Sequence, residues 1–590
     1  MSYDLKTIKA PRIEGRPLRY LAALLEHPFT GTIPARRFLS LVGIDQFRAA
    51  RYHEAPLWYP IVPAPDTQRG DLSSRALPDE NLLTSLGVTR RPPESWVFPS
   101  MGDYARAYRD GTLQPSQVAD RIIQILETRN SGPSPLSSFT SWNAEDIRRQ
   151  AKESEQRFAD GSARSVLEGV PMAVKDEVDV AGHPTSLGTE FLTVTAAAED
   201  AWIVARLREA GVLLIGKTNM HEVGLGVTGL NPFHGTPVNP YAPWRYPGGS
   251  SSGSASAVAS GICPAAIGCD GGGSVRIPAA YCGVFGLKLT MGRSSARGEY
   301  PLARTVANAG PIAGNARDLA LTYLTMAGPD PEDSLSLLQP RPDIDGFLDD
   351  ITGVRIGIYP PWFNDARKEV VEIAEALIDR LRDAGAETVD IELPELDSLR
   401  IAHLITITTE MRAALSEFSR DHRTDFSNES RANLALARYL NSEDYIKAQQ
   451  VRAHLLKTFS SVFETVDVIA TPTTANLPPR LNRNRPSSGV SDLTSMTQTM
   501  RYAIPANMLG FPAVSVPAGF VTARSRPFPQ SADRVDENEN TFSEVPVGLQ
   551  FMGRHWEEAL LLRLARVCEE LVARPRPRVY LSPFLSPFEV

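Results

Sequence analysis

Two hydrophobic periodicities alternate along the chain from about residue 101 onward. Apolar residues that recur three and four positions apart predict amphipathic helices, and short continuous apolar runs predict buried strands. By this criterion we expect helices at residues 116–128, 143–158, 200–210 and 367–384. We expect strands at residues 170–174, 212–215, 354–359, 466–470, 513–516 and 547–551.

Strands separated by helices are typical of an α/β protein with a mixed or largely parallel sheet. Residues 1–95 differ, because they are rich in Arg and Pro and contain an apolar segment at 18–25 and a basic one at 33–51. We therefore expect an N-terminal extension over residues 1–95 and a large α/β domain over residues 96–590. Residues 482–491 and 522–544 are predicted to be mobile loops.

Composition excludes several classes of protein. The 590 residues include 61 Lys and Arg against 69 Asp and Glu, a net charge of −8, and 42% are hydrophobic. This is a globular composition, and it argues against a nucleic-acid-binding protein, which needs a basic surface. Apolar runs fall far short of the ~20 residues of a membrane-spanning helix, and the first residues lack a secretory signal pattern. Four cysteines predict neither a disulfide framework nor a metal site, so we expect an intracellular protein without metal or cofactor.

Three segments match well-known motifs but lack the structural context that those motifs need. Residues 211–218 match the phosphate-binding loop, yet their four central residues are apolar and predict a buried strand. Residues 224–229 match the dinucleotide fingerprint, but no apolar strand precedes them and Pro232 follows, so we expect a glycine-rich loop. Residues 249–253 match the nucleophile elbow of α/β-hydrolases, but a turn-like Tyr-Pro-Gly precedes them instead of a strand.

The run of three glycines before Ser274 is unusual inside a folded core, since each glycine carries a cost in backbone entropy. Backbone N–H groups that converge on one point would form an oxyanion hole, and the adjacent serine would supply a nucleophile. The simpler alternative is a plain glycine turn.

Lys175 ends the apolar strand predicted at 170–174. Burial disfavours the charged form of a lysine, so a lysine in an apolar site can act as a base. A serine nucleophile needs such a base, and lysine replaces histidine in that role on unrelated folds. The alternative is a lysine paired with Asp176 or Asp179, its charged end reaching toward water.

Taken together, residues 248–254, 270–276 and 174–176 resemble the amidase signature family. The similarity continues through residues 216–222, 471–474, 510–517 and 546–553, and covers most of residues 100–575. The resemblance implies the amidase signature fold for residues 96–590: a large mixed β-sheet flanked by helices on both faces. Residues 1–95 would then be a helical extension of that domain.

In that family, a lysine, a serine after a cis peptide bond and a nucleophilic serine form a proton relay. The resemblance assigns Lys175 as the base, Ser250 as the bridging serine and Ser274 as the nucleophile. Ser250 lies 24 residues before Ser274, which is the spacing of the family pattern. Of the three serines at 250–252, only the first satisfies it.

The glycine loop receives its role from the same resemblance. The backbone amides of Gly271, Gly272 and Gly273, with that of Ser274, would form the oxyanion hole. Asp270 and Arg276 flank the loop, and we expect them to hold its shape rather than to take part in the chemistry.

Within the family, the chain is most similar to the plant-type fatty acid amide hydrolases. Segments outside the catalytic core carry this similarity, at residues 8–15, 24–26, 101–108, 362–365 and 444–449. It implies hydrolysis of N-acylethanolamines or related fatty acid amides through a long apolar channel, and a homodimer. The chain departs from the family at Cys269, where Thr is commoner, and in the loop at 522–544.

The apolar segment 18–25 has two interpretations. It fits a helix on a membrane surface, with Arg36, Arg37, Arg48 and Arg51 facing anionic lipid. It equally fits a helix packed over the catalytic domain or a dimer partner.

Three other functions compete with the lipid amidase. A small-amide or aryl-acylamide hydrolase would keep the chemistry and have a short, polar pocket. A glutamine-hydrolysing subunit of a tRNA amidotransferase is a second alternative, against which the N-terminal extension and residues 482–491 argue. A non-catalytic binding protein on the same scaffold is the third, and the presence of Lys175, Ser250 and Ser274 disfavours it.

Overall fold

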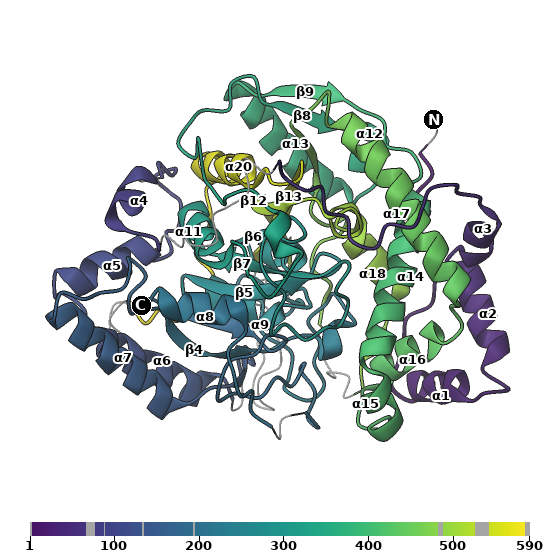
Figure 1. The fold of residues 1–590 in the computed structure, drawn as a ribbon, viewed down its shortest axis with the longest axis horizontal. Coiled ribbons are helices and arrows are strands. Elements are labelled where there is room, and N and C mark those ends of the chain that lie inside the picture. Colours follow the sequence, from purple (N-terminus) through teal and green to yellow (C-terminus); the bar gives the residue numbers. More distant parts are fainter. Residues whose placement is uncertain are drawn as a thin grey trace.

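A single large sheet organises the chain in the computed structural model (Figure 1), which describes residues 3–65, 77–87, 89–131, 135–192, 195–481, 488–524 and 542–584. Its eleven strands lie in the order β2-β4-β3-β5-β7-β6-β12-β13-β10-β8-β9. The bounds are β2 Phe139–Ser141, β3 Pro171–Lys175, β4 Leu213–Thr218, β5 Ala265–Asp270, β6 Phe285–Lys288, β7 Asn308–Ala313, β8 Arg355–Ile358, β9 Glu387–Asp390, β10 Val468–Pro472, β12 Ala513–Arg524 and β13 Phe542–Gly553.

Parallel and antiparallel pairs both occur in this sheet. The neighbours β4, β3 and β5 run parallel, as do β10, β8 and β9, while the strands between the two groups pair antiparallel. The α/β class and the large mixed sheet are therefore confirmed. All six predicted strands are present, and residues 213–218 form β4 rather than a phosphate loop.

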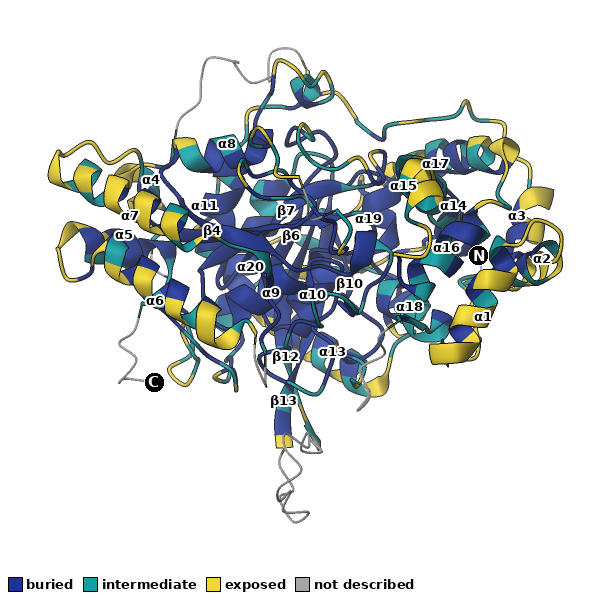
Figure 2. Cartoon of the chain, turned by 90° about the horizontal axis from the view of Figure 1, so that it is seen from below, coloured by how far each residue is buried: buried dark blue, intermediate teal, exposed yellow. Residues whose placement is uncertain are grey.

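Helices cover both faces of the sheet, and their outer surfaces are exposed while the central strands are buried (Figure 2). The four predicted helices appear as α6 Pro115–Arg129, α7 Ala144–Ala159, α8 Trp202–Glu209 and α13 Lys368–Asp383. In α13, the residues that face the sheet recur at helical spacing: Val370, Ala374, Leu377, Ile378 and Leu381. This periodicity is what made the helix predictable.

The other helices have the bounds α4 Glu80–Ser85, α5 Met101–Arg109, α9 Ser252–Ala259, α10 Arg276–Tyr281, α11 Ala316–Met326, α12 Pro360–Phe363, α15 Ser416–Asp421, α19 Ile504–Met508 and α20 Glu558–Leu571. None of the described helices combines the length and apolarity that crossing a bilayer would take.

The short helix α9 explains the abundance of Gly, Ser and Ala after residue 248. It packs closely on β3, β4, β5 and β7, and a Cβ atom at Gly253 would collide with the backbone of Ser138 and Asn219. Two of its buried hydroxyls donate to backbone carbonyls outside the helix, Ser254 Oγ to Ile267 O at 2.9 Å and Ser256 Oγ to Val238 O at 2.7 Å. Small residues are therefore required because the helix lies close to the strands.

A second helical layer was not predicted from the sequence. It contains α14 Leu396–Ala414, α16 Asn428–Ala437, α17 Ser442–Val462 and α18 Leu493–Met500. Buried residues lie around much of the circumference of α14, because α16, α17 and α19 pack on it from different sides. A helix buried in this way lacks the one-sided apolar stripe on which the prediction of helices relied.

The N-terminal segment packs on this second layer through α1 Gly15–Glu26, α2 Thr32–Leu41 and α3 Ile44–Ala49. Leu18, Ala22 and Leu25 of α1 pack against Ala432 and Ala435 of α16. The segment 18–25 is thus a helix packed on the main domain, while a contact of its outer face with a membrane stays a prediction. The domain boundary near residue 95 also stays a prediction.

Parts of the two predicted loops are strands instead. Val490–Ser491 forms β11 and pairs with β1 Ile13–Glu14, and residues 482–487 lie outside the described residues. In the segment 522–544, the β12–β13 ladder continues to the pair Arg524 and Phe542, and residues 525–541 lie outside the described residues. The ladder extends this far because Val521 and Ala523 pack with Val545 in a small apolar cluster.

Candidate active site

Lys175 occupies the last position of β3, and its side chain is 1% exposed. Its Nζ donates to Ser250 Oγ at 2.8 Å and to Cys269 O at 3.3 Å, and lies 2.7 Å from Glu177 Oε2. Neither Asp176 nor Asp179 is its partner, since Asp176 lies near Lys217 and Asp179 accepts from Thr185. The amine is therefore directed at the hydroxyl that the sequence singled out.

Ser250 and Ser274 come together in the turn before α9 and in the loop after β5. The peptide bond between Gly249 and Ser250 is cis. The next residue, Ser251, donates its backbone N–H to Ser274 O at 3.2 Å, which ties the two loops together. Both serines are buried, with 2% and 7% exposure. The structure thus places Lys175, Ser250 and Ser274 in one buried region.

The glycine loop turns sharply between β5 and α10. Gly273 has φ +104°, a conformation that side chains disfavour, and a Cβ there would lie 2.6 Å from Ile277 Cδ1. Its N–H donates to Asp270 Oδ1 at 2.6 Å. Within the described part of the chain, the N–H groups of Gly271, Gly272 and Ser274 have no acceptor. These three amides are the ones available to an oxyanion.

A fully buried ion pair holds this loop. Arg276 Nε and Nη2 each donate to Asp270 at 3.0 Å, and the same guanidinium donates to Asn507 Oδ1 and Gln550 Oε1 at 2.6 Å. Burial alone would raise the pKa of the Asp270 carboxyl, but Arg276 and the surrounding donors hold that pKa well below its usual range. Asp270 is therefore ionised, and both its oxygens are committed to the loop.

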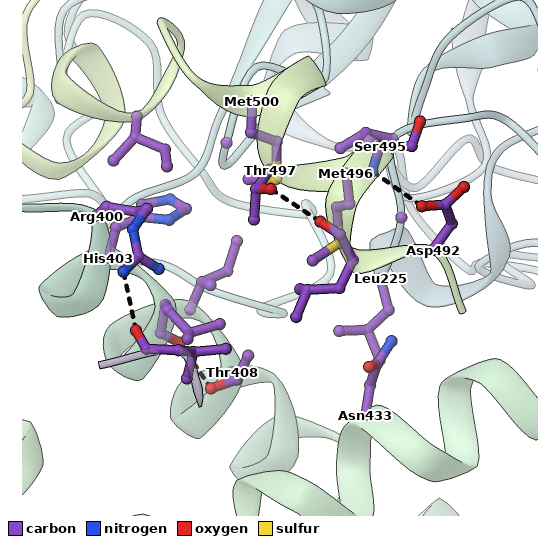
Figure 3. A pocket seen from close by; sticks show the side chains of 18 of the residues that line it. Leu225, Arg400, His403, Thr408, Asn433, Asp492, Ser495, Met496, Thr497 and Met500 are labelled. Carbon is purple, nitrogen blue, oxygen red and sulfur yellow. Dashed lines mark hydrogen bonds between the residues drawn. The ribbon is translucent and has the colours of Figure 1, made fainter. Parts of the chain in front are cut away.

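A cleft opens above Ser274 and Gly272. In Figure 3, His403 and Thr408 of α14 lie on one side of the cleft, and Met496 and Met500 of α18 on the other. Most of the lining is apolar, and the N-terminal segment contributes to it: Leu5, Phe38, Leu39 and Val42. This cleft is a route by which an apolar molecule can reach Ser274.

Three polar residues of the site were missed in the sequence. Glu177 contacts Lys175, Asn507 donates to the backbone and carboxylate of Asp270, and His403 Nε2–H donates to Gly271 O at 2.7 Å. Burial lowers the pKa of His403 to about 4, so the imidazole is neutral near pH 7. No spacing signal connects His403 or Asn507 with the motifs, because the fold alone brings α14 and α19 to the loop.

No group of three or more potential metal ligands occurs in the described ranges. A buried amine next to a serine hydroxyl, free backbone amides and an apolar approach are features that suit the hydrolysis of an acyl substrate. A hydrolase is the class of protein that these features indicate.

Comparison with known proteins agrees with this class. The amidase family model matches residues 130–562. A fatty acid amide hydrolase of Medicago truncatula is 36% identical over 98% of this chain and 95% of its own length. A subunit of the glutamyl-tRNA(Gln) amidotransferase of Coxiella burnetii is 33% identical over 77% of this chain and 94% of its own. The native peptide amidase of Stenotrophomonas maltophilia superposes with a TM-score of 0.66 and 28% identity, over 81% of this chain and 98% of that one.

The chain belongs to the amidase family, and it is an amidase that hydrolyses amide bonds. The amidase signature fold, which the resemblance in sequence predicted, is confirmed as well.

The ion pair of Arg276 and Asp270 gives a first prediction. Replacing Arg276→Met should lower the free energy of unfolding by about 3–5 kcal/mol, because it leaves a buried carboxylate without its counter-charge. Urea denaturation followed by circular dichroism measures this loss. The double variant Asp270→Asn with Arg276→Met should be more stable than Arg276→Met alone. A single variant as stable as the wild type would contradict the assignment of the pair as the support of the loop.

Proposed function

We propose that the protein hydrolyses fatty acid amides, such as N-acylethanolamines, to a free fatty acid and an amine. The observation that supports the chemistry best is the buried contact of 2.8 Å between Lys175 Nζ and Ser250 Oγ, beneath the cleft that reaches Ser274. Lys175 is the base, Ser250 transmits the proton and Ser274 is the nucleophile.

The reaction follows from these positions. Neutral Lys175 takes the proton of Ser250, Ser250 takes that of Ser274, and Ser274 Oγ attacks the amide carbonyl. The same relay returns a proton to the leaving amine, which departs poorly without one. Water then hydrolyses the acyl-enzyme.

The glycine loop of Gly271, Gly272 and Gly273 stabilises the oxyanion. Because the Gly273 amide is bound to Asp270, the amides of Gly271, Gly272 and Ser274 carry this role in the present conformation. One donor of this kind contributes about 3–4 kcal/mol in comparable sites. Asp270 and Arg276 keep the loop in this shape and take no part in proton transfer.

The substrate class rests on the cleft and on the relatives. The apolar side chains of α14, α18 and the N-terminal segment offer an acyl chain a surface along its length. The fatty acid amide hydrolases match nearly the whole chain, including the N-terminal segment, whereas the amidotransferase subunits match 77% of it. This difference favours a fatty acid amide as the substrate over the glutamine that an amidotransferase subunit hydrolyses.

An N-acylethanolamine series from acetyl to twenty-carbon acyl tests this proposal. We expect kcat/KM to rise with chain length, by at most about fourfold per methylene, because each buried methylene contributes about 0.8 kcal/mol. Ser274→Ala should abolish the activity, and Ser252→Ala, a neighbouring serine outside the relay, should retain it.

Each contrary result rejects a different part of the proposal. Activity confined to short or aryl amides would reject the lipid substrate and retain the relay. Equal activity of Ser274→Ala and wild type would reject the relay. Co-purification with partner subunits, together with glutamine hydrolysis, would favour the amidotransferase alternative.

Peripheral contact with a membrane is a further part of the proposal. Five apolar side chains of the first two helices and the turn between them are exposed, with Phe29 84% exposed: Tyr20, Leu24, Phe29, Ile33 and Leu41. Arg48 is exposed, but its guanidinium is paired with Asp444, so it is less free to contact anionic lipid than expected. The homodimer implied by the resemblance stays a prediction.

Flotation with neutral phosphatidylcholine vesicles measures this contact. The double variant Phe29→Ser and Ile33→Ser should reduce the bound fraction severalfold, because it removes two strongly exposed side chains from the apolar surface. Its hydrolysis of a short, soluble amide should match that of the wild type. An unchanged bound fraction would argue against membrane contact through these helices.

A further inference from the structure

A second cavity, of about 350 Å³, lies where the end of α1 meets α15 and α16, outside the cleft that leads to Ser274. Figure 1 shows α1 beside α16 in this part of the molecule. The cavity is lined by five arginines and one acid: Arg412, Arg420, Arg423, Arg431, Arg438 and Glu26. So many guanidinium groups around one cavity are notable in a protein whose net charge is −8.

The acids near this cavity do not balance its charge. Glu26 Oε2 accepts from Arg431 at 2.7 Å and from Arg423 at 3.1 Å, and Arg420 pairs with Asp421. One carboxylate of the lining, that of Glu26, faces five guanidinium groups, and Asp421 and Glu417 lie near Arg420. The cavity therefore carries a surplus of positive charge.

One arginine has no partner at all. In the described residues, no acid or other acceptor contacts the side chain of Arg412, which is exposed to solvent, and its partial burial and the nearby Arg438 lower its pKa. The hydroxyl of Ser419, which also lines the cavity, is buried without a partner in the same part of the chain. A buried polar atom without a partner is uncommon in native proteins and calls for a ligand or water.

We propose that this cavity binds a phosphate group. Guanidinium groups match the oxygens of phosphate, and a serine hydroxyl completes such a site with a neutral donor. The group could be carried by a free phosphate compound or by the headgroup of an anionic phospholipid. The exposed Leu24 and Phe29 flank Glu26 in the sequence, so a lipid headgroup would reach the cavity from the surface that these side chains would contact.

The test compares two variants of the full-length protein with equal charge. Arg412→Gln with Arg420→Gln removes two cavity arginines without disturbing Glu26, and Arg106→Gln with Arg129→Gln removes two exposed arginines elsewhere. Inorganic phosphate is titrated by calorimetry, and vesicles of phosphatidic acid are compared with vesicles of phosphatidylcholine.

We expect wild type and the control variant to bind phosphate or phosphatidic acid vesicles, and the cavity variant to bind at least about tenfold more weakly. Weakened binding of inorganic phosphate identifies a site for a free phosphate compound. Weakened binding of phosphatidic acid vesicles alone identifies a lipid headgroup site. Equal binding by the two variants to both probes, or no binding by the wild type, overturns the proposal.

A separate observation concerns Glu177, which lies 2.7 Å from Lys175 Nζ and is buried with it. The groups that face it are Lys175 on β3, Cys269 on β5 and Glu299, with Arg304 beyond Glu299. Burial and the charge of Glu177 raise the pKa of Glu299 to about 8, so Glu299 is protonated near pH 7. Glu177 is thus the carboxylate that faces the amine.

We propose, on the basis of the relay under Proposed function, that Glu177 is a positioning residue that receives the proton of Lys175. The ammonium and carboxylate become an amine and a carboxylic acid when one proton moves from Nζ to Oε2. The amine then accepts the proton of Ser250. The transfer removes two charges from a buried site, where burial disfavours the charged forms.

The pH profile of Glu177→Gln separates this role from a merely structural one. If Glu177 receives the proton, Lys175 of the variant must release its proton to water before it can act as a base. The acid limb of the pH profile of kcat/KM then moves to higher pH. If Glu177 is only a counter-charge, its removal makes the ammonium easier to deprotonate, and the limb moves to lower pH. When the limb moves by about one pH unit, the rate at a fixed pH below it changes about tenfold.

Controls distinguish failure of this role from failure of the relay. Glu299→Gln, which replaces a protonated carboxyl by a neutral amide, should leave the limb near its wild-type position. Activity in Lys175→Ala or Ser274→Ala would reject the relay itself. Suppose that Lys175→Ala and Ser274→Ala are both inactive. If the acid limb of the Glu177→Gln profile then stays in place or moves to lower pH, the proposed role of Glu177 is overturned and the relay is retained.

Discussion

The parallel pairing of β3 with β5 is the constraint on which the site depends. The register places Met172 opposite Ala265 and Val174 opposite Ile267, so that both strands end at the same edge of the sheet. Lys175 ends the first strand and Asp270 ends the second, and the glycine loop begins at once. Side chains at the carboxyl ends of neighbouring parallel strands are held close without any contribution from flexible loops. The α9 helix then fits against both strands only because its residues are small.

The elements predicted correctly were those with a clear periodicity. The strands β3 and β4 are short apolar runs, and α13 has a one-sided apolar stripe. In contrast, β5 and β7 are rich in Gly and Ala and were not among the predicted strands, since their side chains carry little hydrophobic signal. The helix α14 was missed for the opposite reason, because it is buried around much of its circumference.

The site was predictable where chemistry is concentrated in short motifs. Lys175, Ser250 and Ser274 belong to segments whose spacing is specific, and the structure brings them together. Glu177 was visible two residues after the lysine, but nothing in the sequence preferred it to Asp176 or Asp179. A β-strand alternates its faces, and the turn after β3 decides which of the three carboxylates meets the amine. His403 depends wholly on the packing of the second helical layer over the loop.

The central claim is that Ser274, activated through Ser250 and Lys175, is the nucleophile. Labelling with a long-chain alkyl fluorophosphonate, followed by mass spectrometry of the intact protein and of its peptides, tests it most directly. The account predicts one label per chain, on the peptide that contains Ser274, and labelling slowed at least about a hundredfold in Lys175→Ala. A label on another serine, or labelling of Lys175→Ala at the wild-type rate, would contradict it.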